Sequence, residues 1–207
     1  MNKLIAEFIG TFFLVFAIGM TGDPLAIGVM LMVMVYFAGN ISGAQFNPAV
    51  SLGIFLRGKM TATEMAQYMA VQILGALCAS VFVYLITHKT FAPAPLETIN
   101  ILKPLAVEMV CTFALMTVIL AVATTKKATG NSYYGLAIGF TITACAYAGG
   151  GISGGAFNPA VGLGPCLVDT LIGENDSLSH VWIYIVGPLT GAVVAAFTFK
   201  LTNPGEE

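Results

Sequence analysis

A ten-residue segment occurs twice in this chain, and it limits severely what the chain can fold into. The copies at residues 41–50 and 152–161 read ISGAQFNPAV and ISGGAFNPAV, differ only at their fourth and fifth positions, and are offset by 111 residues (152 − 41). Both contain Asn-Pro-Ala, in which Asn is a favoured helix N-cap and Pro is favoured at the first helical position. Neither copy carries a charge. Each therefore predicts a helix that begins inside an apolar region.

The charge-free stretches around the two copies have the wrong length for ordinary membrane spans. They cover residues 25–56 and 128–168, which is 32 and 41 residues (56 − 25 + 1 and 168 − 128 + 1). Because a spanning helix needs about 20 apolar residues, each stretch is too long for one span and too short for two with a loop. Residues 48–56 would form about 13 Å of helix, nearly half of a hydrocarbon core of ~30 Å. We therefore predict that each copy begins a half-helix near the middle of a membrane.

The rest of the chain supplies the remaining spans. Only 9% of the residues are charged and 57% are hydrophobic, whereas soluble domains carry roughly 25% charged residues. Further long apolar runs lie at residues 4–22, 65–87, 104–125 and 181–199. We predict an all-α membrane protein of six transmembrane helices plus two half-helices. The net charge of −2 argues against nucleic acid as a partner.

The repeat extends beyond the ten-residue segment. Leu-Ala-Ile-Gly at residues 25–28 recurs at 136–139, and Glu7 recurs as Glu108. We therefore expect one channel domain, residues 1–207, made of repeats at about 1–90 and 100–207. Since each repeat has three spans, an odd number, the second must be inserted upside down, which gives an inverted-topology repeat.

Basic residues set the expected orientation, because cytoplasmic loops are enriched in them. Six spans place on one side Lys3, Arg57, Lys59, Lys126, Lys127 and Lys200, and on the other side Lys89 and Lys103. We expect both termini in the cytoplasm, an external connection at residues 88–103, and a location in the cell (plasma) membrane. Trp182 and Tyr184 are expected near the external interface.

The paired Asn-Pro-Ala half-helices, the inverted repeat and the glutamate in each first span resemble the aquaporin and glycerol-facilitator family over essentially the whole chain. The resemblance implies a passive channel for water and small uncharged solutes, embedded in a lipid bilayer as a homotetramer, with no catalytic residue, cofactor or metal. It places at the pore centre Asn47, Pro48, Ala49, Asn158, Pro159 and Ala160.

Each pore asparagine is expected to donate its side-chain N–H to a passing water molecule, and the half-helix N-termini to repel protons and cations. Glu7 and Glu108 are costly inside a membrane unless paired. The resemblance implies that they hold the non-helical backbone before each half-helix, and Gln72 is expected to support the same backbone. A symmetric pair of buried acids would also suit a proton-coupled secondary transporter, which is the less favoured alternative.

The chain departs from the family at the residue that follows the second Asn-Pro-Ala, where most members carry arginine and this chain carries Val161. Counting from the motif places the other filter positions at Ile27, Ala146 and Gly155. Since none of these four side chains offers a hydrogen-bond donor or a charge, we expect a wide and apolar outer filter. A facilitator mainly for glycerol, urea, ammonia or metalloid hydroxides is the alternative to a water channel.

Overall fold

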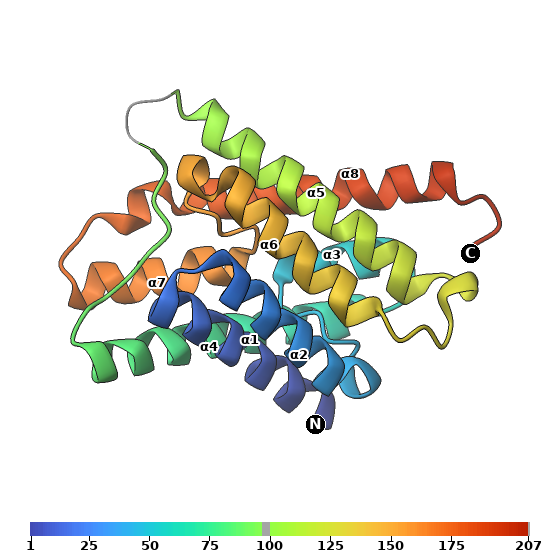
Figure 1. Ribbon diagram of the computed structural model, residues 1–207, viewed down its shortest axis with the longest axis horizontal. Coiled ribbons are helices and arrows are strands. Elements are labelled where there is room, and N and C mark those ends of the chain that lie inside the picture. Colours follow the sequence, from blue (N-terminus) through green and yellow to red (C-terminus); the bar gives the residue numbers. More distant parts are fainter. Residues whose placement is uncertain (97–99, 207) are drawn as a thin grey trace.

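A computed structural model describes residues 1–96 and 100–206 of this chain, and within these ranges two short α-helices and six long ones make up the fold. The long helices are α1 (Asn2–Thr21), α2 (Pro24–Ser42), α4 (Ala62–Thr87), α5 (Leu102–Thr124), α6 (Tyr134–Ser153) and α8 (Val181–Thr202). All six are long and apolar enough to cross a membrane. The short ones are α3 (Pro48–Leu56) and α7 (Pro159–Ile172), which lie on either side of the centre in Figure 1. The predicted all-α membrane fold is confirmed, although part of the connection at residues 88–103 and the final residue of the second repeat lie outside the described ranges.

Local sequence signals set where the helices begin and end. α1 stops at Gly22, whose φ of 62° is left-handed, and Asp23 then caps α2 by accepting a bond from the Ala26 N–H at 2.8 Å. α4 begins with a capping box in which Thr61 and Glu64 each bond the other's backbone N–H, an arrangement that satisfies two otherwise unpaired donors. The first half-helix has the bounds that its sequence predicts. The second is longer, at 14 residues, and it contains Pro165.

The helices pack in pairs that repeat between the two halves. α1 packs on α4 as α5 packs on α8, while α2 packs on α6 across the two halves. The Leu-Ala-Ile-Gly segments meet at this crossing, because a Cβ atom on Gly28 would lie 2.6 Å from the Gly139 carbonyl oxygen and one on Gly139 would lie 2.4 Å from that of Gly28. The repeated glycines thus allow the two halves to touch backbone to backbone.

Glycines at matching places also bring the paired helices within each half together. A Cβ atom on Gly75 would lie 2.7 Å from the Phe8 carbonyl oxygen, and one on Gly191 would lie 2.3 Å from that of Met109. Distances below 3 Å cannot be relieved here by a side-chain rotation, because the obstructing atom belongs to the backbone.

Substitution of Gly191 by alanine is therefore expected to destabilise the protein by about 1–3 kcal/mol, the usual cost of overpacking. Gly151→Ala is the matched control, because a Cβ atom there meets nothing within 4 Å and alanine favours a helix by roughly 1 kcal/mol over glycine. Thermal unfolding in detergent should show a lower midpoint for Gly191→Ala and an unchanged or higher one for Gly151→Ala. An equal midpoint for the two variants would contradict this account of the helix contact.

Candidate functional site

Asn47 and Asn158 join the two half-helices at their N-terminal ends. The side-chain oxygen of each caps its own helix, accepting from the Ala49 N–H and the Ala160 N–H at 2.9 Å. The side-chain nitrogen of each donates to the other repeat: Asn47 to the Phe157 carbonyl and Asn158 to the Phe46 carbonyl, both at 2.9 Å. Since an amide NH₂ has two hydrogens, each asparagine keeps one N–H that a molecule in the pore can use.

The backbone before each half-helix is held in an unusual conformation. Phe46 and Phe157 have φ values of 51° and 49°, and Ala44 has 49° where the second repeat has Gly155 at 70°. Left-handed backbone at non-glycine residues costs of order 1–3 kcal/mol and persists only where the surroundings impose it. The same turn in both repeats presents the two phenylalanine carbonyls to the opposing asparagines.

Two buried glutamates hold these turns in place. The Glu7 carboxyl oxygens accept from the Ser42 hydroxyl at 2.6 Å, from the N–H groups of Gln45 and Phe46 at 3.0 and 2.7 Å, and from the Gln72 side chain at 2.8 Å. Both glutamates are fully buried. Four donors thus converge on the Glu7 carboxyl group from the end of α2, from the loop that follows it and from α4.

Glu108 repeats this arrangement with one donor fewer. Its carboxyl oxygens accept from the Ser153 hydroxyl at 2.7 Å and from the N–H groups of Ala156 and Phe157 at 3.0 and 2.6 Å. Pro188 occupies the place that corresponds to Gln72 (188 − 72 = 184 − 68, the offset that relates Tyr184 to Tyr68). Since proline carries no side-chain donor, the second carboxyl group is held less extensively than the first.

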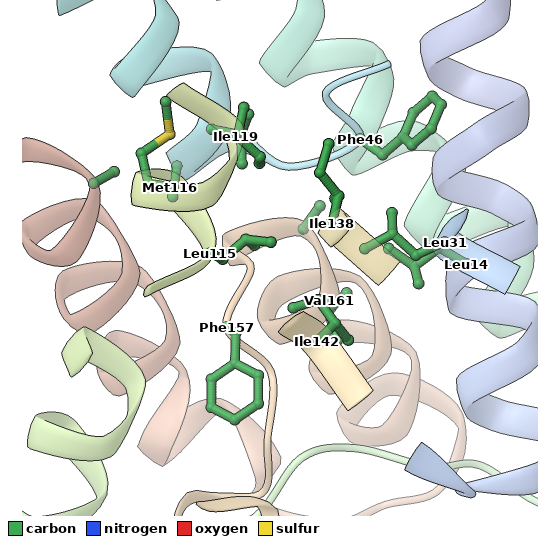
Figure 2. Packing of buried hydrophobic residues seen from close by; sticks show 14 of the residues in the cluster. Leu14, Leu31, Phe46, Leu115, Met116, Ile119, Ile138, Ile142, Phe157 and Val161 are labelled. Carbon is green, nitrogen blue, oxygen red and sulfur yellow. The ribbon is translucent and has the colours of Figure 1, made fainter. Parts of the chain in front are cut away.

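A narrow cavity of paired residues runs between the half-helices. Nine of its lining positions in the first repeat have a counterpart in the second, at an offset of 101 or 111: 14 and 115, 18 and 119, 27 and 138, 31 and 142, 44 and 155, 45 and 156, 46 and 157, 47 and 158, 50 and 161. The nineteenth lining residue is Ala146. Figure 2 shows Leu115, Ile138, Ile142 and Val161 around this space, with the rings of Phe46 and Phe157 turned away from each other.

The cavity is narrow and mostly apolar. The space open to the centres of water-sized spheres is about 40 Å³, and one water needs roughly 10–15 Å³ measured in this way. It therefore has room for only a few water-sized molecules. Asn47, Asn158 and the four positions expected to form the filter, Ile27, Ala146, Gly155 and Val161, line the same cavity.

Sequence comparison decides which family this architecture represents. The family described as Major intrinsic protein matches residues 1–199, which is nearly the whole chain. The chain belongs to the major intrinsic protein family.

Relatives within this family agree with the assignment. Aquaporin NIP1-1 of Zea mays is 39% identical over 97% of this chain and 74% of its own length. Nodulin-26 of Glycine max is 34% identical over 98% of this chain and 78% of its own length. The X-ray structure of the aquaglyceroporin from Plasmodium falciparum matches with a TM-score of 0.89 and 25% identity, covering 99% of this chain and 98% of that one.

Membership of the major intrinsic protein family establishes the broad function. Its members are passive channels for water and small solutes, so this chain is a multi-pass integral membrane channel and not an enzyme. Within the described ranges, the structure contains no cluster of three or more His, Cys, Asp or Glu side chains that could hold a metal ion.

Two tyrosines that support the pore loops were not identified from the sequence of this family member. Tyr68 donates to the Ser42 carbonyl at 2.9 Å, and Tyr184 donates to the Ser153 carbonyl at 2.7 Å. Tyr184 does not anchor the protein by facing lipid, because its side chain is fully buried. Tyr68 and Tyr184 occupy equivalent positions in the third span of each half. This correspondence is visible in the sequence and could have identified them.

Proposed function

We propose that this chain conducts water and small uncharged solutes through the paired cavity, excludes protons and cations at the asparagine pair, and selects solutes at an apolar outer filter. The observation that carries the proposal is that Asn47, Asn158 and all four expected filter positions line one and the same cavity. A passage that joins the half-helix N-termini to the filter is the geometry required for conduction.

Exclusion of protons and cations follows from the asparagine pair. One N–H of each amide is committed to a carbonyl of the opposite repeat, which fixes the direction of the remaining N–H. A water that accepts both free N–H groups through its oxygen cannot pass a proton along the file. The half-helix N-termini add positive potential at the same point, which opposes cations.

Selection among neutral solutes follows from the filter. Ile27, Ala146, Gly155 and Val161 carry neither a donor nor a charge, so backbone carbonyls remain the main polar contacts. We infer that a filter without bulky or charged side chains admits neutral solutes besides water, with glycerol, urea, ammonia and metalloid hydroxides as candidates. The structural likeness to the aquaglyceroporin from Plasmodium falciparum supports this class of solute.

The proposal also covers the domain organisation, membrane location, orientation and oligomeric state of the channel. Residues 1–207 would form one domain with repeats at about 1–90 and 100–207, placed in the cell membrane with both termini in the cytoplasm and assembled as a homotetramer. Large apolar side chains are exposed on the long helices, among them Leu74, Phe82, Leu85, Phe140 and Phe197. Such surfaces suit contact with lipid or with neighbouring subunits.

Stopped-flow measurements on proteoliposomes test the function. Water, glycerol, urea and ammonia should each be compared with protein-free vesicles, and at least one should pass rapidly, with a low activation energy and without dependence on an ion gradient. Flux that saturates and follows a proton gradient would overturn the passive channel in favour of a coupled transporter.

Replacement of Asn158 by alanine is expected to raise proton conductance about tenfold, which corresponds to a barrier lower by about 1.4 kcal/mol. The change removes a pore donor, a helix cap and a bond to the first repeat. A pH-sensitive dye inside vesicles measures the leak. Asn203→Ala, at the end of α8 and outside the cavity lining, is the control, and an equal leak in both variants would contradict the barrier assigned to Asn158.

A further inference from the structure

Arg57, the only arginine of the chain, is buried far from the pore centre. It follows the last residue of α3 directly and is 8% exposed. Charged side chains are almost never buried to this extent unless they are paired. The ion pair found within the described ranges joins Lys3 to Glu64 instead. Arg57 therefore carries a buried positive charge that no carboxylate of the described residues neutralises.

The guanidinium group of Arg57 is held at one edge and on one face. Its Nε donates to the Thr124 hydroxyl at 3.4 Å, and its Cζ lies 5.0 Å from the centre of the Phe199 ring. Its two terminal nitrogens have no acceptor among the described residues. They are not enclosed either, because the unpaired side-chain atoms that the described part of the chain buries completely belong to Gln45 and Thr170.

A pocket opens beside this guanidinium, between the ends of α3 and α8 and the segment that follows α8. Figure 1 shows that segment turning back from the end of α8. The space open to the centres of water-sized spheres is about 650 Å³, which is room for a group much larger than water. The charged residues that line it are Arg57, Lys59, Lys200 and Glu206.

The charge of this Arg57 pocket is positive, with three cations against the one acid Glu206. The Glu206 carboxyl group accepts the backbone N–H of Lys126 at 2.8 Å. Lys59 and Lys200 are exposed, so their side chains can turn toward a ligand. Attraction of cations to the carboxyl ends of helices accounts for the two lysines, but it does not account for a buried guanidinium whose terminal donors are unused.

We propose that the Arg57 pocket binds a phosphate group that carries two negative charges, supplied either by inorganic phosphate or by the terminal phosphate of a lipid such as phosphatidic acid. The planar guanidinium can donate to two phosphate oxygens at once, and Lys59 and Lys200 supply the remaining charge. The pocket lies on the side expected to be cytoplasmic, where basic pockets between spans bind lipid head groups. Because α3 packs on α8, the bound phosphate holds the first half-helix to the last span.

Thermal unfolding of the purified protein in detergent tests the site. Raising inorganic phosphate at fixed pH and ionic strength should raise the midpoint, because a ligand that binds only the folded state stabilises it. In Arg57→Gln the apparent affinity for phosphate should fall about tenfold or more, the equivalent of one charge-assisted hydrogen bond. Each variant is compared with its own midpoint without phosphate, so the intrinsic stability of Arg57→Gln does not enter the result.

A second variant carries Lys59→Ala and Lys200→Ala together, which changes only exposed side chains and should also weaken phosphate binding about tenfold. The matched control carries Lys103→Ala and Lys127→Ala, which removes two exposed cations that do not line the pocket, and it should bind phosphate as the parent protein does. Equal phosphate affinity of the parent protein, Arg57→Gln and the lysine variant would overturn the site.

Native mass spectrometry with added lipid distinguishes the two sources of phosphate. Retention of phosphatidic acid over phosphatidylglycerol, lost in Arg57→Gln, identifies a lipid head group as the ligand. A midpoint raised by inorganic phosphate without such retention identifies free phosphate. If neither probe binds in a manner that depends on Arg57, the proposal is wrong. None of these measurements involves permeability, so the Arg57 pocket and the proposed channel function stand or fall separately.

Discussion

Val161→Arg is expected to reduce urea and glycerol permeability about tenfold or more, a barrier higher by at least about 1.4 kcal/mol, while water permeability changes less. Val161 lines the cavity directly after the second Asn-Pro-Ala. A guanidinium group there would narrow this small cavity and bring five N–H donors and a permanent charge. Water can use those donors in little space, whereas larger solutes meet an obstruction.

The measurement compares permeabilities for water, urea and glycerol in proteoliposomes of the same protein density. Val161→Met is the control, because it adds bulk without charge and separates the two causes. Proton leak measured in the same vesicles should be no higher in Val161→Arg than in the parent channel. Unchanged urea and glycerol permeability in Val161→Arg would disprove the outer filter assigned to Val161.

Loss of the Glu7 side chain is expected to have the largest effect on stability. Glu7→Ala leaves four donors without their acceptor, two from the backbone and two from Ser42 and Gln72. Each buried group left unpaired costs about 1–3 kcal/mol, so we expect a loss of about 4 kcal/mol or more. Glu108→Ala leaves three donors without an acceptor and should destabilise the protein less.

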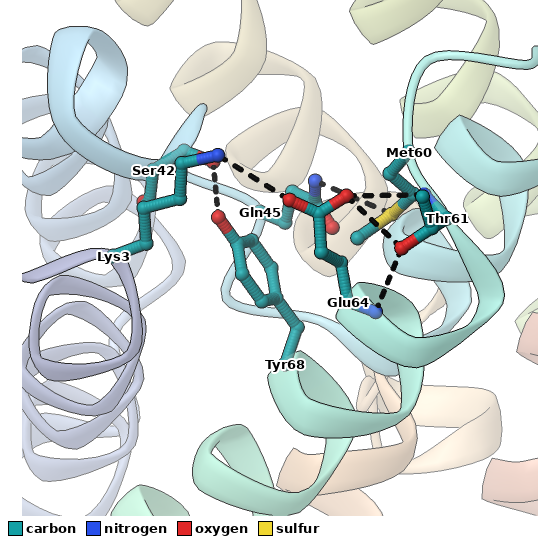
Figure 3. Close-up of polar contacts among 7 residues, drawn as sticks. All are labelled: Lys3, Ser42, Gln45, Met60, Thr61, Glu64 and Tyr68. Carbon is teal, nitrogen blue, oxygen red and sulfur yellow. Dashed lines mark hydrogen bonds and ion pairs between the residues drawn. The ribbon is translucent and has the colours of Figure 1, made fainter. Parts of the chain in front are cut away.

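Thermal unfolding and the yield of monodisperse protein in detergent measure how strongly each variant is destabilised. Glu64→Ala is the control, because this exposed residue contributes only a capping box and one surface ion pair with Lys3 (Figure 3); such contacts contribute about 1 kcal/mol each. The expected order of midpoints is Glu64→Ala highest, then Glu108→Ala, then Glu7→Ala. A Glu7→Ala midpoint equal to that of Glu64→Ala would contradict the support assigned to the pore loop.

Most of the fold could be predicted because the membrane constrains it so strongly. Helix lengths follow from the thickness of the hydrocarbon core, and Asn47-Pro48 marks a helix start that no full span can accommodate. The bounds of α3 were predictable for this reason. Those of α7 were not, because Pro165 looks like a place for a helix to end, whereas α7 continues through it to Ile172.

Only those parts of the site that repeat between the two halves of the sequence could be predicted. Spacing from Asn47 and Asn158 places the four expected filter positions, and all four line the cavity, although their role as a filter stays a prediction. The bonds from each asparagine to the opposing phenylalanine carbonyl depend on the left-handed turns at Phe46 and Phe157, which a sequence does not reveal at non-glycine residues.

The bonds between the halves also have a consequence for biosynthesis. The ribosome completes the first repeat before the second exists, and at that stage the Asn47 amide and the Phe46 carbonyl lack the Phe157 carbonyl and the Asn158 amide that they bond in the finished protein. The first repeat can insert its three spans, yet its re-entrant turn remains incomplete until the later segment arrives. Closure of the pore centre is therefore a late step of assembly, because a chain truncated before residue 158 lacks the Asn158 amide that bonds the Phe46 carbonyl.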